Sequence, residues 1–224
     1  MDAFFPPACA GCGKLGSRWC TDCQTSVKTI DKNICTICGL PQERDRICQA
    51  CVEERPRFRA LRAWARYEGS VRQALHRLKY HKDIGLGETL AITMIPFVQS
   101  LKWQPDLLLP VPLGRKRLRE RGYNQVAVIA RPLASALGIS FSEQVVFRQR
   151  ETQSQVGLNR HERIMNMDRA FSIKGPVGGK VIVLMDDVST TGSTLSSAAG
   201  MLYEAGAREV FALTVARALR LDQS

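Results

Sequence analysis

Two adjacent aspartates and the hydroxyl-rich residues after them are the part of the sequence best suited to chemistry. Asp186 and Asp187 precede Val188 and the segment Ser189-Thr190-Thr191-Gly192-Ser193-Thr194 (the hydroxyl-rich segment). Hydroxyls and free backbone N–H groups bind phosphate, glycine lets the backbone approach it, and carboxylates accept hydrogen bonds from sugar hydroxyls. The pattern predicts a sugar-phosphate site, with the carboxylates on the sugar. An acidic pair that only caps a helix is the alternative.

The flanking residues place this segment between a strand and a helix. Val181 to Met185 is apolar throughout, which is typical of a central strand of a parallel sheet covered on both faces. Leu195 to Glu204 has helical character and is expected to stop at Gly206. A loop between strand and helix lies at the carboxyl edge of an open α/β sheet, where such folds bind ligands.

All eight cysteines lie in the first 51 residues, as four Cys-x-x-Cys pairs. The pairs are Cys9 and Cys12, Cys20 and Cys23, Cys35 and Cys38, and Cys48 and Cys51. Two such pairs make one tetrahedral S₄ site, so the pattern predicts two structural Zn²⁺ sites. Sequential pairing forms the shorter loops and is our prediction; interleaved pairing stays open. Gly13 and Gly39 each follow a pair and suit the bend of a metal knuckle.

Disulfides and redox-active Cys-x-x-Cys motifs are the alternatives to zinc. We expect no secretory signal and no membrane insertion, and therefore a cytoplasmic protein in which thiols stay reduced. Four redox motifs within so short a segment are also more than that chemistry needs. The 224 residues, 45% hydrophobic and 24% charged, suit an ordinary folded protein. We predict a zinc module over residues 1–55 and an α/β domain over residues 56–224.

The net charge of +11 is unevenly placed along the chain. Residues 1–55 hold seven basic and seven acidic residues, whereas the remainder holds 25 basic and 14 acidic residues. Such an excess attracts phosphates, on a small ligand or along a nucleic acid. A solvated surface is the alternative. The three histidines are expected on the surface or in loops. The candidates for nucleic-acid contact are Arg72, Lys79, Arg117, Arg119 and Arg121.

The first part of the larger domain is expected to be a strand and a basic helix. Ala60 to Tyr67 resembles a strand, and Ser70 stands where the N-cap of a helix over Val71 to Tyr80 is expected. Further on, Leu107 to Pro110 is expected to be a short strand, and Asn124 and Gln125 are expected to begin a helix that runs to Leu137 and to donate toward a ligand.

The segment Val181 to Thr194 resembles the phosphoribosyl-pyrophosphate signature of type I phosphoribosyltransferases. Together with the cysteine module, it makes the chain similar to the ComF family of GntX-like competence and DNA-utilisation proteins. Further matching segments are His76-Arg77-Leu78-Lys79-Tyr80, Pro110-Val111-Pro112, Arg121-Gly122-Tyr123-Asn124-Gln125, and the spaced residues Arg150, Thr152, Gln155, Leu158, Arg163, Asn166 and Phe171.

The resemblance implies an α/β fold of the type I phosphoribosyltransferase kind, a parallel sheet with helices on both faces, preceded by a small double zinc ribbon. It implies a pyrophosphate loop with Arg115 and Lys116, Mg²⁺ bound with phosphoribosyl pyrophosphate, and a hood over Arg148 to Asp168. It also implies a role in DNA uptake during natural competence, with single-stranded DNA and a protein of the competence machinery as partners. An active transferase with an unknown acceptor is the alternative.

Overall fold

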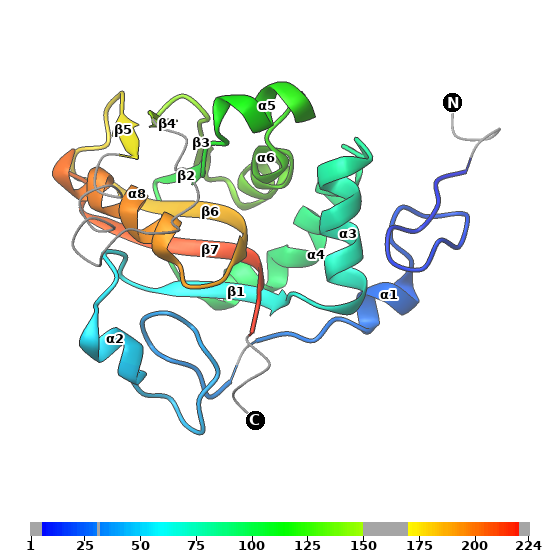
Figure 1. Cartoon of the computed structure of the whole chain (residues 1–224), viewed down its shortest axis with the longest axis horizontal. Coiled ribbons are helices and arrows are strands. Elements are labelled where there is room, and N and C mark those ends of the chain that lie inside the picture. The colour runs from blue at the N-terminus through cyan, green and yellow to red at the C-terminus, as the bar shows by residue number, and fades with distance from the viewer. Residues whose placement is uncertain (1–5, 31, 150–169, 220–224) are drawn as a thin grey trace, which may run out of the picture.

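The computed structural model of the chain describes residues 6–30, 32–149 and 170–219. At its centre is a five-stranded parallel sheet with the strand order β1-β7-β6-β2-β3 (Figure 1). The strands are β1 (Leu61–Arg66), β7 (Glu209–Arg217), β6 (Val181–Ser189), β2 (Leu107–Pro110) and β3 (Ser140–Phe141). The prediction of a parallel sheet is confirmed, and the apolar run from Val181 lies in its central strand.

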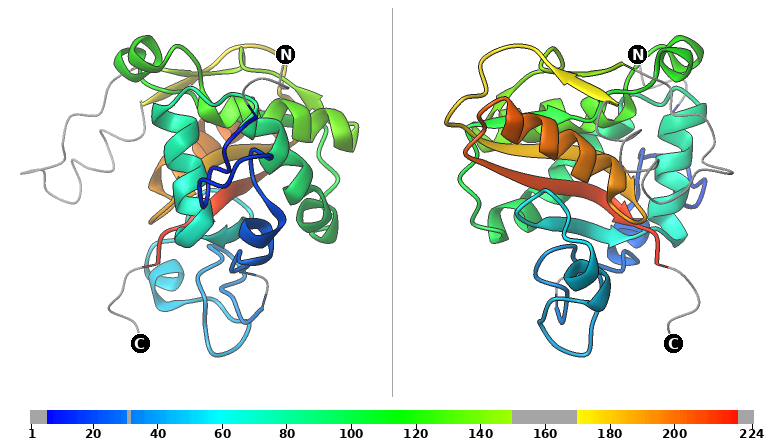
Figure 2. Two further views of the ribbon diagram at one scale, coloured as in Figure 1. Left: turned by 90° about the vertical axis from the view of Figure 1, so that its right-hand side faces the viewer. Right: turned by 60° about the vertical axis from the view of Figure 1, so that its left-hand side comes forward.

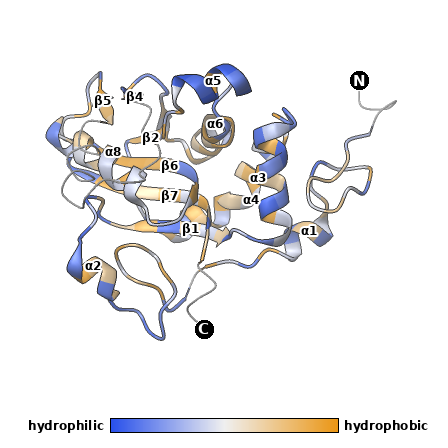
Figure 3. Ribbon diagram, viewed as in Figure 1, coloured by the Kyte–Doolittle hydropathy of each residue, from blue (hydrophilic) through white to orange (hydrophobic). Residues whose placement is uncertain are grey.

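Helices cover both faces of the sheet. One face packs against α3 (Gly69–Tyr80), α4 (Leu86–Ser100) and α6 (Gln125–Leu137), and the other against α8 (Ser193–Glu204). Along β6, Val183 and Met185 belong to the first core and Ile182 and Leu184 to the second, which is why the strand is apolar at every position from Val181 to Met185 (Figure 3). The other helices within the described residues are α1 (Thr21–Thr25), α2 (Gln49–Glu53) and α5 (Arg115–Arg121).

The predicted hood, Arg148 to Asp168, begins at the last residue of β4 (Val146–Arg148) and stops before β5 (Phe171–Ile173). These two strands pair antiparallel, Arg148 opposite Phe171. Residues 150–169 between them lie outside the described residues, and so do Arg150, Thr152, Gln155, Leu158, Arg163, Asn166 and His161. Within the described ranges, no helix has the length and apolar character that crossing a bilayer requires.

Three local predictions at the ends of elements are wrong. Strand β6 does not stop at Met185; it continues to Ser189 because it keeps pairing with β7, Asp186 opposite Thr214 and Ser189 opposite Arg217. Helix α8 begins earlier than expected, at Ser193. Ser70 is not the N-cap of α3, which is Glu68.

The cysteine-rich residues divide into two clusters, and the first packs with the core on one face of the sheet and the second with the core on the other. Figures 1 and 2 show the first beside α3 and the second next to the edge strand β1. The first, beside α3, contributes Trp19, whose ring meets Trp64 of β1 edge-to-face at 5.9 Å. The second lies against β1, where the N–H of Leu61 donates to the carbonyl of Ile37 at 2.7 Å. Both clusters therefore share the apolar cores of the sheet, and a domain boundary near residue 55 stays a prediction.

Close packing of α4 on α6 depends on Gly87. A Cβ there would lie 2.3 Å from Cγ1 and 2.6 Å from the carbonyl oxygen of Val128, and the backbone oxygen cannot move aside cheaply. We expect Gly87→Ala to lower the unfolding free energy by about 1–3 kcal/mol, measured by urea denaturation. Gly178→Ala is the control, because nothing lies within 4 Å of a Cβ at that position. Equal stability of the two variants would contradict this packing.

Candidate functional site

The carboxylate of Asp187 lies buried at the carboxyl end of β6, with partners from two helices. Lys79 Nζ of α3 lies 2.5 Å from its Oδ2, and Gln125 Nε2 of α6 donates to the same oxygen at 3.1 Å. Its Oδ1 accepts the N–H of Val188 at 2.8 Å. A buried carboxylate is costly unless paired, and here a cation and an amide pair it. The structure therefore adds Lys79 and Gln125 to the site that was predicted around Asp186 and Asp187.

Asp186 differs from its neighbour in charge. Burial raises the pKa of Asp186 to about 8, and the negative charge of Asp187 adds to the rise. Its Oδ1 accepts the N–H of Asp187 at 2.8 Å. At neutral pH Asp186 is therefore mainly protonated and offers an O–H donor, while Asp187 forms an ion pair with Lys79. The two adjacent acids thus present different hydrogen-bonding groups.

The hydroxyl-rich segment turns from β6 into α8 at the same edge of the sheet. Thr190, Thr191 and Ser193 are exposed, and Gly192 is the N-cap of α8 with φ +81°. The hydroxyl of Thr191 accepts the N–H of Ser193 at 3.4 Å. The N-terminus of a twelve-residue helix with exposed hydroxyls around it suits a phosphate. Of the other predicted residues, Ser189 is buried in the strand and Thr194 is half-buried.

The loop after β2 lies beside these acids. Pro110 pairs with Met185, and the N–H of Val111 donates to the carbonyl of Met185 at 2.8 Å. Arg115 and Lys116, predicted for pyrophosphate, begin α5 directly after this loop and are exposed. The cations predicted for a leaving group therefore follow the strand that neighbours the acidic pair.

In this structure the side chains of Asn124 and Gln125 donate to protein groups, and their donation toward a ligand stays a prediction. Asn124 caps α6 through Val126, and its Nδ2 donates to the carbonyl of Val111 at 2.9 Å. Gln125 donates to Asp187, and its Oε1 accepts from Arg121. Both side chains hold protein groups in position, because the buried carbonyl and carboxylate each need a donor.

The candidates for nucleic-acid contact fall into two groups. Lys79 is turned inward by its ion pair and is only 18% exposed, which contradicts its assignment to an open basic surface. A second feature, which the sequence did not reveal, is a pair of aromatic rings on α3 with an arginine of α5 beside them. His76 and Tyr80 of α3 contact with ring centroids 4.7 Å apart, and Arg121 lies 5.6 Å from the centre of the Tyr80 ring.

We call these exposed rings and the cations around them the basic face. Tyr80 is 65% exposed, and Tyr123 donates from its hydroxyl to the carbonyl of Leu78, which holds the ends of α3 and α5 together. In α5, five of seven residues are basic, and no residue of that helix is buried (Figure 3). The basic face consists of Arg72, His76 and Tyr80, spaced four apart on α3, and of Arg117 and Arg121, spaced four apart on α5. Arg119 stands two residues from Arg117 and from Arg121 and therefore points to another side of α5. His76 and His81 are exposed, as predicted.

The two cysteine clusters fit tetrahedral zinc. Their ligand atoms lie within 4.8 Å of one another in each group of four, which confirms sequential pairing. Cys9 Sγ accepts the N–H groups of Gly11 and Cys20, and Cys35 Sγ accepts those of Cys38 and Cys48 at 3.4 Å. Backbone donors around sulfur stabilise thiolates, the form that binds metal. The first cluster is Cys9, Cys12, Cys20 and Cys23, and the second is Cys35, Cys38, Cys48 and Cys51.

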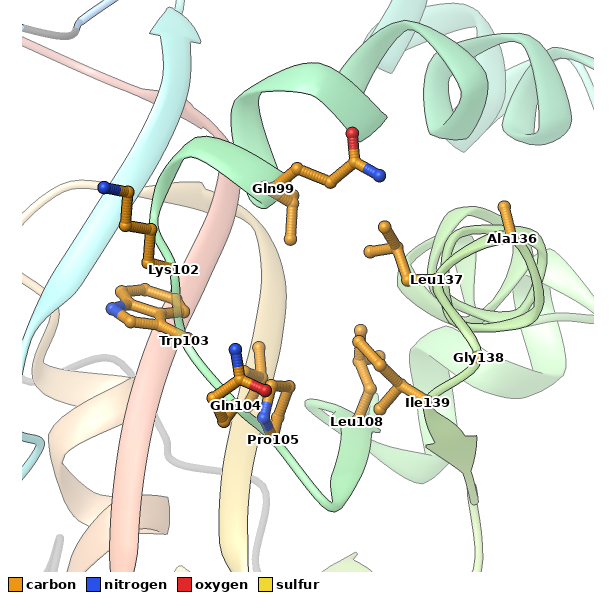
Figure 4. Close-up of a pocket in the computed structure, with 12 residues that line it drawn as sticks. Gln99, Lys102, Trp103, Gln104, Pro105, Leu108, Ala136, Leu137, Gly138 and Ile139 are labelled. Atoms are coloured by element: carbon orange, nitrogen blue, oxygen red, sulfur yellow. The ribbon is translucent and has the colours of Figure 1, made fainter.

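A hollow of about 620 Å³ lies away from all these residues, between the ends of α4 and α6 (Figure 4). Trp103, Leu108, Leu137 and Ile139 line it, and the Trp103 ring stacks on Phe211 at 4.5 Å. Leu108 stands near the start of its strand, so the hollow is at the amino edge of the sheet. It is therefore separate from the predicted sugar-phosphate site at the carboxyl edge.

Comparison with known proteins adds to this geometry. Residues 1–52 match the model of the double zinc ribbon domain. The chain is 31% identical to the DNA utilization protein YhgH of Shigella flexneri, covering 89% of this chain and 90% of that protein. It is 30% identical to competence protein ComFC of Bacillus subtilis, covering 91% and 86%. A glutamine phosphoribosylpyrophosphate amidotransferase from B. subtilis is 24% identical, with TM-score 0.40, covering 63% of this chain and 26% of that one.

The raised pKa of Asp186 predicts a pH dependence of stability. Between the ordinary carboxyl pKa of 3.8 and about 8, the folded state binds more protons than the unfolded state, so the unfolding free energy falls as pH rises through this window. We expect Asp186→Asn to remove that part of the decline, measured by urea denaturation at several pH values from 5 to 8. Glu120→Gln, an exposed change in α5, should keep the native profile. If the unfolding free energy of Asp186→Asn falls with pH as steeply as that of the native protein, the decline does not originate from Asp186.

Proposed function

The chain belongs to the ComF family, and from that premise we propose that it binds phosphoribosyl pyrophosphate at the carboxyl edge of its sheet and single-stranded DNA on the basic face. The observation that carries the first part is the end of β6, where Asp186 and Asp187 lead directly into an exposed, hydroxyl-rich helix N-terminus. The double zinc ribbon and the family support a role in competence and DNA utilisation. We place this role in the cytoplasm, where eight thiols stay available for zinc.

Each part of the ligand has a chemically matched partner in this proposal. The ribose hydroxyls donate to Asp187 and accept from protonated Asp186, and Lys79 offsets the charge of Asp187 beside an anionic ligand. The 5′-phosphate binds the N-terminal N–H groups of α8 and the hydroxyls of Thr191 and Ser193. Arg115 and Lys116 attract the pyrophosphate. Mg²⁺, when bound with the ligand, supplies further neutralisation of the pyrophosphate charge.

Transfer of the phosphoribosyl group is the second candidate function. A nucleophile on an acceptor would bond to ribose C1 as the C1–O bond breaks and pyrophosphate leaves with the electron pair. The position of Arg115 and Lys116 after the neighbouring strand favours it, because cations there stabilise charge on the leaving group. Pyrophosphate release with a panel of bases and amines distinguishes transfer from binding alone.

The basic face supports the proposal for DNA. Single strands bind to surfaces that combine cations along the backbone with exposed rings on which bases stack. Tyr80 offers such a ring, flanked by His76 at 4.7 Å and by Arg121. In α5, Arg117 lies one turn before Arg121 and therefore on the same side of the helix. The cations thus continue from the Tyr80 ring along α5.

Binding of phosphoribosyl pyrophosphate is expected to depend on Asp187 and Thr191. Thr191→Ala removes one protein hydroxyl that is proposed to bond to the charged phosphate of the ligand. This variant should bind about tenfold or more weakly, measured by calorimetry with Mg²⁺. The double variant Asp187→Asn and Thr191→Ala should show no binding. Thr93→Ala in α4, where the hydroxyl donates to the carbonyl of Thr89, is the control and should bind normally. Native affinity in the double variant would refute the assignment.

Binding of an oligothymidine strand is expected to weaken about tenfold in Tyr80→Ala, because stacking of a base contributes about 1–3 kcal/mol. The slope of the logarithm of the binding constant against the logarithm of the salt concentration should stay unchanged in this variant. Arg117→Ala should instead reduce that slope by about 0.7. Phe147→Ala is the matched control: this ring also contacts a cation, Lys174 at 5.2 Å, but lies on β4 outside the basic face. Anisotropy titrations at several salt concentrations measure both effects, and no loss in Tyr80→Ala would exclude this face.

A further inference from the structure

A buried arginine joins the second cluster to the hydroxyl-rich segment. Arg217, the last residue of β7, is 1% exposed. Its Nη1 donates to the carbonyl of Cys38, a residue of the second cluster, and its Nη2 donates to the carbonyl of Thr190 at 3.2 Å. One guanidinium therefore bonds to the metal-binding turn on one side and to the start of the hydroxyl-rich segment on the other. In the sequence this residue is only an arginine after the mainly apolar run Val210 to Ala216, and nothing there indicates its two partners.

The second cluster explains why a charged side chain is tolerated at this position. Burial lowers the pKa of Arg217, and the negative charges of Cys38, Cys48, Cys51 and Cys35 oppose that change. Four thiolates around one Zn²⁺ carry a net negative charge, so the loaded cluster attracts the guanidinium and holds it in place. Arg217 bonds through two rigid arms to two carbonyls at once, which a lysine cannot do with the same geometry.

The backbone around Arg217 brings the same parts together. The N–H of Ala218 donates to the carbonyl of Ser189 at 2.9 Å, so the ends of β7 and β6 are joined where the hydroxyl-rich segment begins. A Cβ on Gly192 would lie 3.5 Å from Leu61 and Phe58, residues packed with the second cluster. A hollow of about 410 Å³ lies between the cluster and the segment, with Cys38, Thr190 and Arg217 among its lining residues.

The first cluster has a different neighbour. Its residues pack with α3, where the hydroxyl of Ser70 donates to the carbonyl of Cys23 at 2.8 Å and Arg77 donates to the carbonyl of Cys9 at 3.4 Å. The chain therefore offers an internal comparison, because the two clusters have the same ligand chemistry and pack with different cores of the sheet.

We propose that Arg217 is a positioning residue through which the metal-loaded second cluster holds the hydroxyl-rich segment in its phosphate-binding conformation. The guanidinium fixes the carbonyl of Thr190 and thereby the direction of the N–H groups that follow it in the turn. Phosphate affinity then depends on metal in the second cluster and is insensitive to metal in the first. This inference rests on the proposed binding of phosphoribosyl pyrophosphate.

Arg217→Lys keeps a positive charge beside the thiolates and loses the two-armed bridge. We expect it to retain two zinc ions per chain and near-native thermal stability, and to bind phosphoribosyl pyrophosphate about tenfold more weakly by calorimetry. Arg62→Lys is the matched control, because Arg62 also bridges carbonyls near this cluster, those of Leu61 and Thr36 at 2.8 and 3.1 Å, without contacting Thr190. Its affinity should equal that of the native protein.

A spectroscopic readout keeps the test independent of affinity alone. In the full chain loaded with Co²⁺ and carrying Cys12→Ser, which removes a ligand of the first cluster, phosphoribosyl pyrophosphate should change the ligand-field bands of the second cluster. Adding Arg217→Lys should remove that change. If the native protein binds no phosphoribosyl pyrophosphate, the proposed function is refuted and this inference with it. If the native protein binds while Arg217→Lys binds equally well, or the cobalt bands stay constant on binding, only the link through Arg217 is refuted.

Discussion

Two adjacent carboxyl groups at the end of a buried strand are the constraint from which the arrangement of the site follows. Two ionised acids side by side in a poorly solvated position repel one another, and each loses hydration. The structure resolves this by treating them differently: Asp187 is paired by Lys79 and Gln125, and burial raises the pKa of Asp186 to about 8. Pairing Asp187 requires α3 and α6 to bring a cation and an amide to one face of β6. The pairing of Asp187 at the carboxyl edge of the sheet therefore depends on how α3 and α6 pack on this face.

The cysteine clusters take part in the same arrangement from both faces. A segment of about fifty residues with few large aliphatic side chains gains its stability from metal and from packing on a larger core. Here the first cluster attaches to α3, the helix that carries Lys79 to Asp187, and the second attaches through Arg217 to Thr190. Each cluster therefore supports one half of the proposed sugar-phosphate site, the first the acidic pair and the second the hydroxyl-rich segment.

The sequence predicted the parts of this site that lie close together along the chain. An apolar run, two acids, a hydroxyl-rich segment and a helix follow one another directly, so strand, edge and helix N-terminus could be inferred, and the cysteine spacing predicted both clusters. The contacts of Lys79 and Gln125 with Asp187, and of Arg217 with Thr190, could not be predicted, because the partners are 108, 62 and 27 residues apart in sequence. The length of β6 was missed for the same reason: pairing with β7 keeps Asp186 to Ser189 extended, whatever their local turn propensity.

Helix geometry separates the two proposed ligands although they share neighbouring residues. Successive residues of a helix point about 100° apart, so Lys79 turns toward Asp187 while the adjacent Tyr80 turns outward beside Arg121. Arg121 also donates to Gln125, the amide that pairs Asp187, which brings the basic face within two hydrogen bonds of the acidic pair. Along α5, Arg115 and Lys116 stand nearest the loop after β2, whereas Arg117 and Arg121 share the side that meets Tyr80. Five cations on one short helix exceed what a pyrophosphate needs, and this division by face gives four of them, all but Arg119, to one or the other proposed ligand.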